Sequence, residues 1–173
     1  MVIDEAYTPF TDADYLNLAD EYDNVLVMRT LSKAGLAGLR LGLLVGNPRW
    51  IAELEKIRLP YNIGVLTQAS AEFALKHYDV LRQQTVLIRE ERANLYKELS
   101  AIETLTVWQS EANFILFRTQ QDQAKAVFEG LREHHILIRC LDGAHPLLKD
   151  CLRVTVGSAA ENEAFLRELR AVL

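Results

Sequence analysis

The sequence has little cysteine, no long apolar run and no basic run, and each shortage excludes a class of protein. Its two cysteines, Cys140 and Cys151, lack the C-x-x-C spacing of zinc and redox motifs, so we expect free thiols and no metal site. No apolar stretch approaches the roughly 20 residues that cross a bilayer, and no signal-peptide pattern opens the chain. A formal net charge of -5 argues against nucleic acid as a partner. Together these shortages predict a cytoplasmic protein without membrane contact.

What the 173 residues do contain is an alternation of short apolar runs with amphipathic stretches, which predicts an α/β fold. We expect buried strands at 2–3, 25–28 and 41–45, and further strands at 107–108, 114–117, 136–138 and 152–156. Helices are expected at 11–22, 48–58, 65–77, 79–100, 121–134 and 161–173. Ser158 and Glu161 form a capping-box pattern at the start of the last helix.

The order of these elements indicates two parts joined by a long helix. Residues 79–100 form one amphipathic stretch that could bridge two subdomains, and 101–173 has the pattern of a complete small α/β subdomain. The chain opens on an apolar pair followed by Asp4, as a buried strand would. A compact domain seldom begins with a central strand, so we expect further sequence upstream.

The stretch "RTLSKAGLAGLRLG", residues 29–42, is the first candidate for chemistry. Lys33 follows a predicted strand and could form a Schiff base with a carbonyl compound. Thr30 and Ser32 add hydroxyl donors, three glycines allow close approach of the backbone, and Arg40 offers a charged fork for a phosphate. A surface lysine after a strand is the more common outcome of spacing alone. The combination predicts a pocket for a phosphorylated carbonyl compound.

Asp4 and Tyr7 could complete such a pocket. A carboxylate at the carboxyl end of a strand lies where α/β sheets bind ligands, and it could keep a pyridine nitrogen protonated. Tyr7 could hydrogen-bond a phenolic oxygen. The alternative is that Asp4 caps a loop and Tyr7 is a half-buried aromatic, and the residues alone favour this alternative.

Arg153 is predicted to point away from the core of the second subdomain. The apolar residues of "LRVTV" alternate, so Arg153 lies on the opposite face of its strand. A solvated arginine at a sheet edge would show the same pattern.

Several motifs in order resemble the histidinol-phosphate aminotransferases, which are fold type I enzymes dependent on pyridoxal phosphate. They are "DEAY", "RTLSKAGLAGLRLG", "PYNIGVLTQASAEFAL", "ANFILFR" and "LRVTVGSAAENEAFLREL". The resemblance implies that Lys33 binds pyridoxal phosphate covalently and later moves a proton. It implies that Asp4 pairs with the pyridinium nitrogen and Tyr7 with the phenolate oxygen. The cofactor phosphate would be held by Thr30, Ser32 and Arg40.

The resemblance also assigns the two arginines of the second subdomain. Arg153 would bind the α-carboxylate of the substrate through a bidentate contact that lysine cannot reproduce. Arg139 would meet the phosphate of histidinol phosphate.

By resemblance, 1–78 corresponds to part of a large cofactor-binding domain, 79–100 to a connecting helix and 101–173 to the small domain. The implied reaction is transamination between glutamate and imidazole acetol phosphate in histidine biosynthesis, by a homodimer. The resemblance covers the C-terminal half of a subunit, so we expect this chain alone to bind the cofactor weakly or not at all and to be inactive. A threonine-phosphate decarboxylase is the alternative enzyme, and a folded fragment without catalysis is the alternative of another class.

Overall fold

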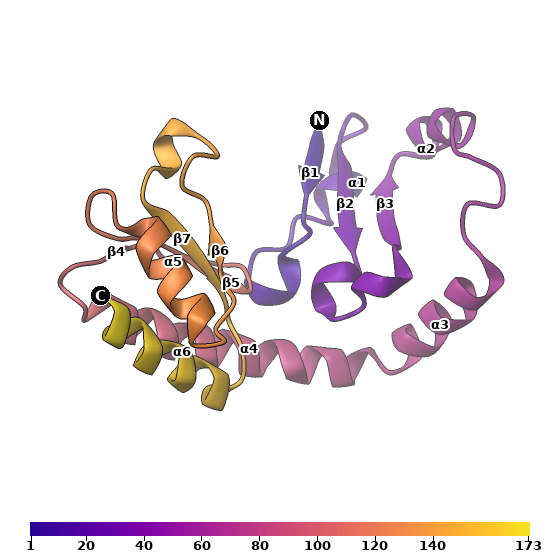
Figure 1. The fold of residues 1–173 in the computed structure, drawn as a ribbon. Helices are drawn as coiled ribbons and strands as arrows, with labels where there is room; N and C mark the ends of the chain where they lie inside the picture. Colours follow the sequence, from indigo (N-terminus) through magenta and orange to yellow (C-terminus); the bar gives the residue numbers. More distant parts are fainter. The chain divides into compact units, whose positions relative to one another are not determined.

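The computed structural model describes residues 1–173 and divides into two compact units (Figure 1). Unit 1 is Met1–Thr85 and unit 2 is Val86–Leu173, so the boundary falls inside helix α4 (Tyr78–Ser100). None of the helices combines the length and the apolar character that a bilayer span requires. The finer division at 78/79 and 100/101 stays a prediction.

Unit 1 contains a three-stranded sheet in the order β1-β2-β3 (Figure 1). The strands are β1 (Val2–Asp4), β2 (Leu26–Thr30) and β3 (Gly42–Gly46). β1 is parallel to β2, whereas β3 is antiparallel to it. The remaining helices of the unit are α1 (Leu18–Glu21), α2 (Pro48–Glu55) and α3 (Val65–Lys76).

The prediction of three buried strands in unit 1 is wrong for β1 and β3. Val27 in the central strand is fully buried, but Val2 is 59% exposed and Leu43 is 43% exposed. A small cluster centred on Ala19, Val25 and Val27 covers one face of the sheet, and β1 and β3 are its edges. An apolar run therefore marked the strands correctly but overstated their burial within this chain.

Two predicted helices of unit 1 are shorter than expected, and local hydrogen bonds explain the late start of the first. The hydroxyl of Thr11 accepts the Ala13 amide and the carboxylate of Asp14 accepts the Leu16 amide, which favours turns, and α1 begins only at Leu18. α2 begins at Pro48 as predicted, but it ends at Glu55.

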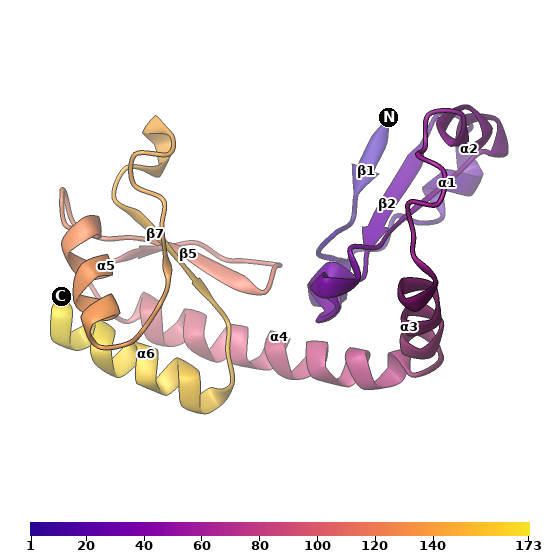
Figure 2. The ribbon, with the colours of Figure 1, turned by 45° about the vertical axis from the view of Figure 1, so that its right-hand side comes forward.

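Unit 2 pairs a four-stranded antiparallel sheet with helices. The strand order is β4-β5-β7-β6, and all three pairings are antiparallel. The strands are β4 (Thr106–Val107), β5 (Phe114–Arg118), β6 (Arg139–Cys140) and β7 (Cys151–Thr155). Helices α5 (Ala124–Glu133) and α6 (Ala159–Val172) run beside each other, as Figure 2 shows.

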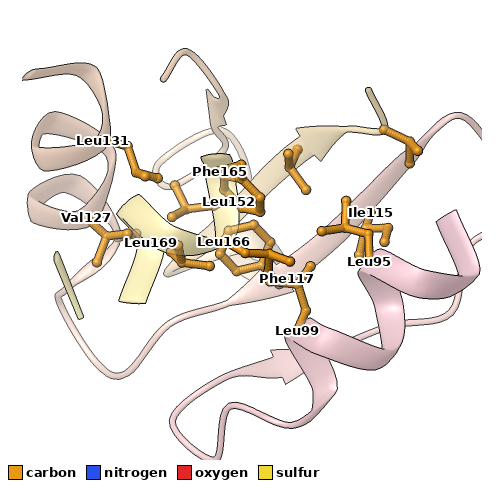
Figure 3. Packing of buried hydrophobic residues seen from close by; sticks show 13 residues of the cluster. Leu95, Leu99, Ile115, Phe117, Val127, Leu131, Leu152, Phe165, Leu166 and Leu169 are labelled. Carbon is orange, nitrogen blue, oxygen red and sulfur yellow. The ribbon is translucent and has the colours of Figure 1, made fainter. Parts of the chain in front are cut away.

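One face of this sheet carries the core of unit 2. Ile115 and Phe117 from β5 meet Leu152 from β7, and the helices cover them (Figure 3). The helical members of the buried cluster are Leu95 and Leu99 of α4, Ala124, Val127 and Leu131 of α5, and Phe165, Leu166 and Leu169 of α6. The predicted capping box of α6 is confirmed, because Ser158 and Glu161 bond each other's backbone in both directions.

The predicted strand at 136–138 is wrong, and the strand in this region is Arg139–Cys140. The Ile136 amide donates to the Leu131 carbonyl at 2.8 Å, and His135 has a left-handed φ of 62°. These residues therefore end α5 with a tight turn, and pairing with β7 begins only after it.

Candidate active site

Asp4 and the segment around Lys33 follow two adjacent parallel strands. Asp4 is the last residue of β1 and Thr30 is the last residue of β2, so both segments leave the sheet at the same edge. Asp4 lies opposite Met28, and side chains alternate along a strand, so Asp4, Met28 and Thr30 share one face. Asp4 and Met28 are exposed, so this face of unit 1 is open.

Lys33 lies in a short 3₁₀ turn, Ser32–Ala34, that the hydroxyl of Thr30 stabilises. The Thr30 hydroxyl accepts the Ser32 amide at 3.0 Å and donates to the Leu41 carbonyl at 3.2 Å. Gly35 ends the turn with a φ of 99°, a conformation that favours glycine. The sequence "TLSKAG" therefore folds into a tight turn that presents the exposed lysine.

The lysine turn meets the segment that follows Asp4. The Lys33 ammonium lies 5.2 Å from the centre of the Tyr7 ring, within the range of a cation–π contact. Asp4 Oδ1 accepts the Ala6 amide at 2.9 Å, which fixes the carboxylate at the strand end. The structure thus brings Lys33 and Tyr7 together beside the strand end that carries Asp4.

Arg40 is held in a strained backbone conformation. It follows the 3₁₀ turn Ala37–Leu39, its φ is 51°, and its side chain is exposed. A left-handed conformation costs a residue with a side chain about 1–2 kcal/mol. This conformation ends the 3₁₀ turn and is shared by Tyr61, Asp122, His135 and Asp150 elsewhere in the chain.

A buried ion pair behind these residues is not visible from the sequence pattern. Glu5 accepts hydrogen bonds from Arg29 Nε at 2.8 Å and from the Tyr15 amide at 2.7 Å, and Asp14 pairs with Arg29 Nη2 at 2.6 Å. Burial disfavours the charged guanidinium, but the hydrogen bond and charge of Glu5, aided by Asp14, raise the pKa of Arg29 above its ordinary value. The feature that draws attention to this network in the structure is the burial of Glu5, which is unusual for a glutamate.

The two candidate arginines of unit 2 face each other across adjacent strands. Arg139 of β6 lies directly opposite Arg153 of β7, and the neighbouring Leu152 and Val154 point into the core. The Arg153 guanidinium lies 4.6 Å from the centre of the Phe114 ring, and its Nε is buried without a hydrogen-bond partner. Like charges opposite each other are unfavourable, so this arrangement suits an anion.

The comparisons with known proteins agree with these features. A family model described as "Aminotransferase class I and II" matches residues 1–169. The chain belongs to this family. A curated histidinol-phosphate aminotransferase 2 from Nitrosococcus oceani is 54% identical over 99% of this chain and 48% of its own length. The chain therefore spans about half the length of the curated relatives it matches.

Solved structures of aminotransferases share the fold. The crystal structure of the histidinol-phosphate aminotransferase from Clostridium acetobutylicum has a TM-score of 0.89 and 25% identity, over 99% of this chain and 53% of that chain. The enzyme from Sinorhizobium meliloti, crystallised in complex with pyridoxal-5'-phosphate, has a TM-score of 0.83 and 28% identity, over 99% of this chain and 49% of that chain. The α/β fold predicted from the sequence is thus confirmed as roughly half of the aminotransferase fold.

Two of the four histidines have hydrogen-bond partners close by in the fold. His134 Nδ1 lies 2.6 Å from Glu168, and His145 Nδ1 accepts the Leu147 amide. Histidine, cysteine and carboxylate side chains form no cluster of three or more that could hold a metal ion.

Proposed function

We propose that this chain carries the lysine and substrate residues of a pyridoxal-phosphate-dependent aminotransferase that exchanges an amino group between glutamate and imidazole acetol phosphate. The observation that carries the proposal is the meeting of Lys33 with Tyr7 beside the strand end of Asp4. Identity of about 50% to several curated histidinol-phosphate aminotransferases supports the choice of substrate.

The residues at the carboxyl ends of β1 and β2 fit pyridoxal phosphate. An exposed amine lies over an aromatic hydroxyl residue, a fixed carboxylate stands at the adjacent strand end, and the guanidinium of Arg40 is exposed. Asp4 would pair with the ring nitrogen, Tyr7 with the phenolic oxygen, and Arg40 with the phosphate. Ser32 would hold the phosphate with Arg40, while the hydroxyl of Thr30 also maintains the lysine turn. When bound, the cofactor supplies an electron sink.

Lys33 and Asp4 would have different roles: Lys33 would transfer the proton, and Asp4 would stabilise charge on the cofactor ring. Lys33 Nζ would take the proton from the substrate α-carbon and pass it to the acceptor carbon of the bound cofactor, and its exposed position over Tyr7 leaves the side chain accessible for this role. The Asp4 carboxylate would pair with the ring nitrogen of the bound cofactor. The backbone bond from Ala6 keeps the Asp4 carboxylate in place during these steps.

Arg153 and Arg139 would bind the two anionic groups of the substrate. Arg153 has a buried Nε without a partner, and a bidentate carboxylate would satisfy the guanidinium. Arg139 is exposed and opposite Arg153, which suits the phosphate of the same class of substrate.

We also propose that the active form is a cytoplasmic homodimer. Unit 1 leaves apolar side chains of the α2–α3 region exposed, among them Tyr61, Leu66 and Phe73, which supports association. Sedimentation velocity across a concentration series tests the dimer.

Borohydride trapping tests the cofactor site. Because borohydride also traps cofactor that is bound only weakly, incubation with excess pyridoxal phosphate and borohydride, followed by peptide mass mapping, should place the cofactor on Lys33, and Lys33→Arg should abolish the adduct. Lys76→Arg, which changes an exposed lysine paired with Glu72, is the matched control and should leave it unchanged. An unmodified Lys33 would favour a folded fragment without catalysis. In the full-length protein, measuring amino-group transfer against carbon dioxide release separates the transaminase from a threonine-phosphate decarboxylase.

A further inference from the structure

Glu5 is a buried carboxylate that the proposed chemistry does not use. Its side chain is 3% exposed, and both of its oxygens accept hydrogen bonds, one from Arg29 and one from the Tyr15 amide. A buried carboxylate is costly unless it is paired and hydrogen-bonded. A stability role alone would not require this pair to lie next to the candidate catalytic residues.

The position of the pair connects the two segments that form the site. Glu5 directly follows Asp4, and its amide donates to the Met28 carbonyl, which continues the pairing of β1 with β2. Arg29 directly precedes Thr30, whose hydroxyl holds the lysine turn. The pair therefore links the residue that directly follows Asp4 with the residue that directly precedes Thr30.

The pair lies on the face of the sheet opposite Asp4. Side chains alternate along strands, so Arg29 shares a face with Val27, which packs in the small cluster beside α1. Asp4 and Thr30 lie on the open face. Glu5 and Arg29 thus act on the site from behind, without reaching a bound molecule on the open face.

We propose that the Glu5–Arg29 ion pair, extended by Asp14, is a positioning element that fixes the relative placement of Asp4 and the lysine turn. This inference rests on the proposed function, because it assigns a role to the same site. Phe10, Leu31 and Ala34 are buried in the segments that follow the two strands, and the ion pair with its further hydrogen bonds adds directional contacts that apolar packing does not supply. Glu5 and Arg29 are positioning residues, whereas Lys33 remains the catalytic one.

Hydrogen exchange in the full chain without cofactor tests the placement directly. The Ala6 amide reports on Asp4 and the Ser32 amide reports on the lysine turn, while the Leu26 amide, bonded to Met1, reports on the opposite end of the sheet. Glu5→Gln should speed exchange at Ala6 and Ser32 about tenfold, as expected for one weakened charge-assisted hydrogen bond, and leave Leu26 unchanged. Equal acceleration at all three amides, or no change at any, overturns the proposal.

A matched variant and a second variant sharpen the result. Glu72→Gln removes an exposed carboxylate paired with Lys76 and should change none of the three amides. Arg29→Lys keeps the charge but cannot bridge Glu5 and Asp14 together, and it should reproduce the effect of Glu5→Gln. If both Glu5→Gln and Arg29→Lys lose their far-ultraviolet dichroism, the pair serves stability and the positioning role is rejected.

Trapping with pyridoxal phosphate and borohydride adds a readout at the lysine. Folded Glu5→Gln should modify Lys33 about tenfold more slowly than the unchanged chain, with Lys125 modified at the same rate. An equal rate at Lys33 counts against the proposal. Failure to modify Lys33 in the unchanged chain rejects the proposed function instead, and the exchange measurement then still decides the positioning role.

Discussion

The two units of the chain differ in how they hold their functional residues. In unit 2 the candidate arginines stand on strands whose other face is packed against three helices (Figure 3). In unit 1 the lysine turn and Asp4 lie beside a small apolar cluster, and hydrogen bonds and an ion pair hold them. Packing therefore dominates around the arginines of unit 2, whereas polar contacts add to a smaller apolar core around the lysine turn of unit 1.

Each unit contains one tryptophan, so the two can be followed separately. Trp50 lies in unit 1 and Trp108 in unit 2. Replacing either by phenylalanine leaves a fluorescence reporter for the other unit.

The largest expected effect is on the core of unit 2. Phe117→Ala should lower the free energy of unfolding reported by Trp108 by about 3–5 kcal/mol, because Phe117 is fully buried. Urea unfolding followed by fluorescence measures it. Phe73→Ala, the same change at a side chain 65% exposed in unit 1, should stay within about 0.5 kcal/mol. Similar losses for both variants would contradict the difference in burial between these two side chains.

A smaller effect of opposite sign is expected at Arg153. Arg153→Met removes a buried donor without a partner, a penalty of about 1–3 kcal/mol, and loses a cation–π contact with Phe114 worth about 0.5–1 kcal/mol. Unit 2 should therefore gain about 1 kcal/mol in the same unfolding experiment. Binding of a carboxylate substrate, followed by calorimetry, should be lost. A destabilised variant would show that the guanidinium supports the fold.

Removal of the capping box should change the stability of unit 2 by a similar amount, but it should be destabilising. Ser158→Ala removes the side chain that caps α6 and should lower the stability of unit 2 by about 1 kcal/mol. Ser70→Ala, within α3 of unit 1, should be neutral or slightly stabilising, since alanine is the better helix former. Thermal unfolding with each tryptophan reporter compares the two, and a loss at Ser70 equal to that at Ser158 would argue against capping.

The smallest effect concerns acid sensitivity of unit 2. Hydrogen bonds from Arg167 and then His134 hold the pKa of Glu168 below its ordinary value of 4.5. Because the folded pKa is depressed, the stabilisation is present above pH 4.5 and is lost as the pH falls through the lower folded value. Glu168→Gln should reduce the loss of unfolding free energy of unit 2 as the pH falls below 4.5, measured by urea unfolding at a series of pH values. An unchanged pH dependence would contradict the assignment.

Much of the architecture followed from patterns of apolar residues, and the exceptions have local causes. The runs at 25–28, 114–117 and 152–156 predicted β2, β5 and β7, because each strand places apolar side chains into a core. The run at 136–138 failed, because the turn after α5 uses the backbone of Ile136. Periodicity does not report such a competing hydrogen bond.

The candidate site also has parts that the sequence predicted and parts that it did not. The lysine motif and Asp4 were identifiable from residue type and position, and the structure brings Lys33 beside Tyr7. Their functional roles stay predictions. The link between Glu5 and Arg29 was not predictable, since it joins charges 24 residues apart and depends on β1 pairing in parallel with β2.

The strand register that places Arg139 opposite Arg153 also affects the choice of buffer for binding measurements. A cationic spot on an acidic protein attracts multivalent anions, and whatever binds only the folded form raises its melting temperature by mass action. Phosphate or sulfate in the medium would then act as a hidden competitor in ligand screens, so weakly coordinating monovalent salts are the appropriate choice for measuring affinities of this chain.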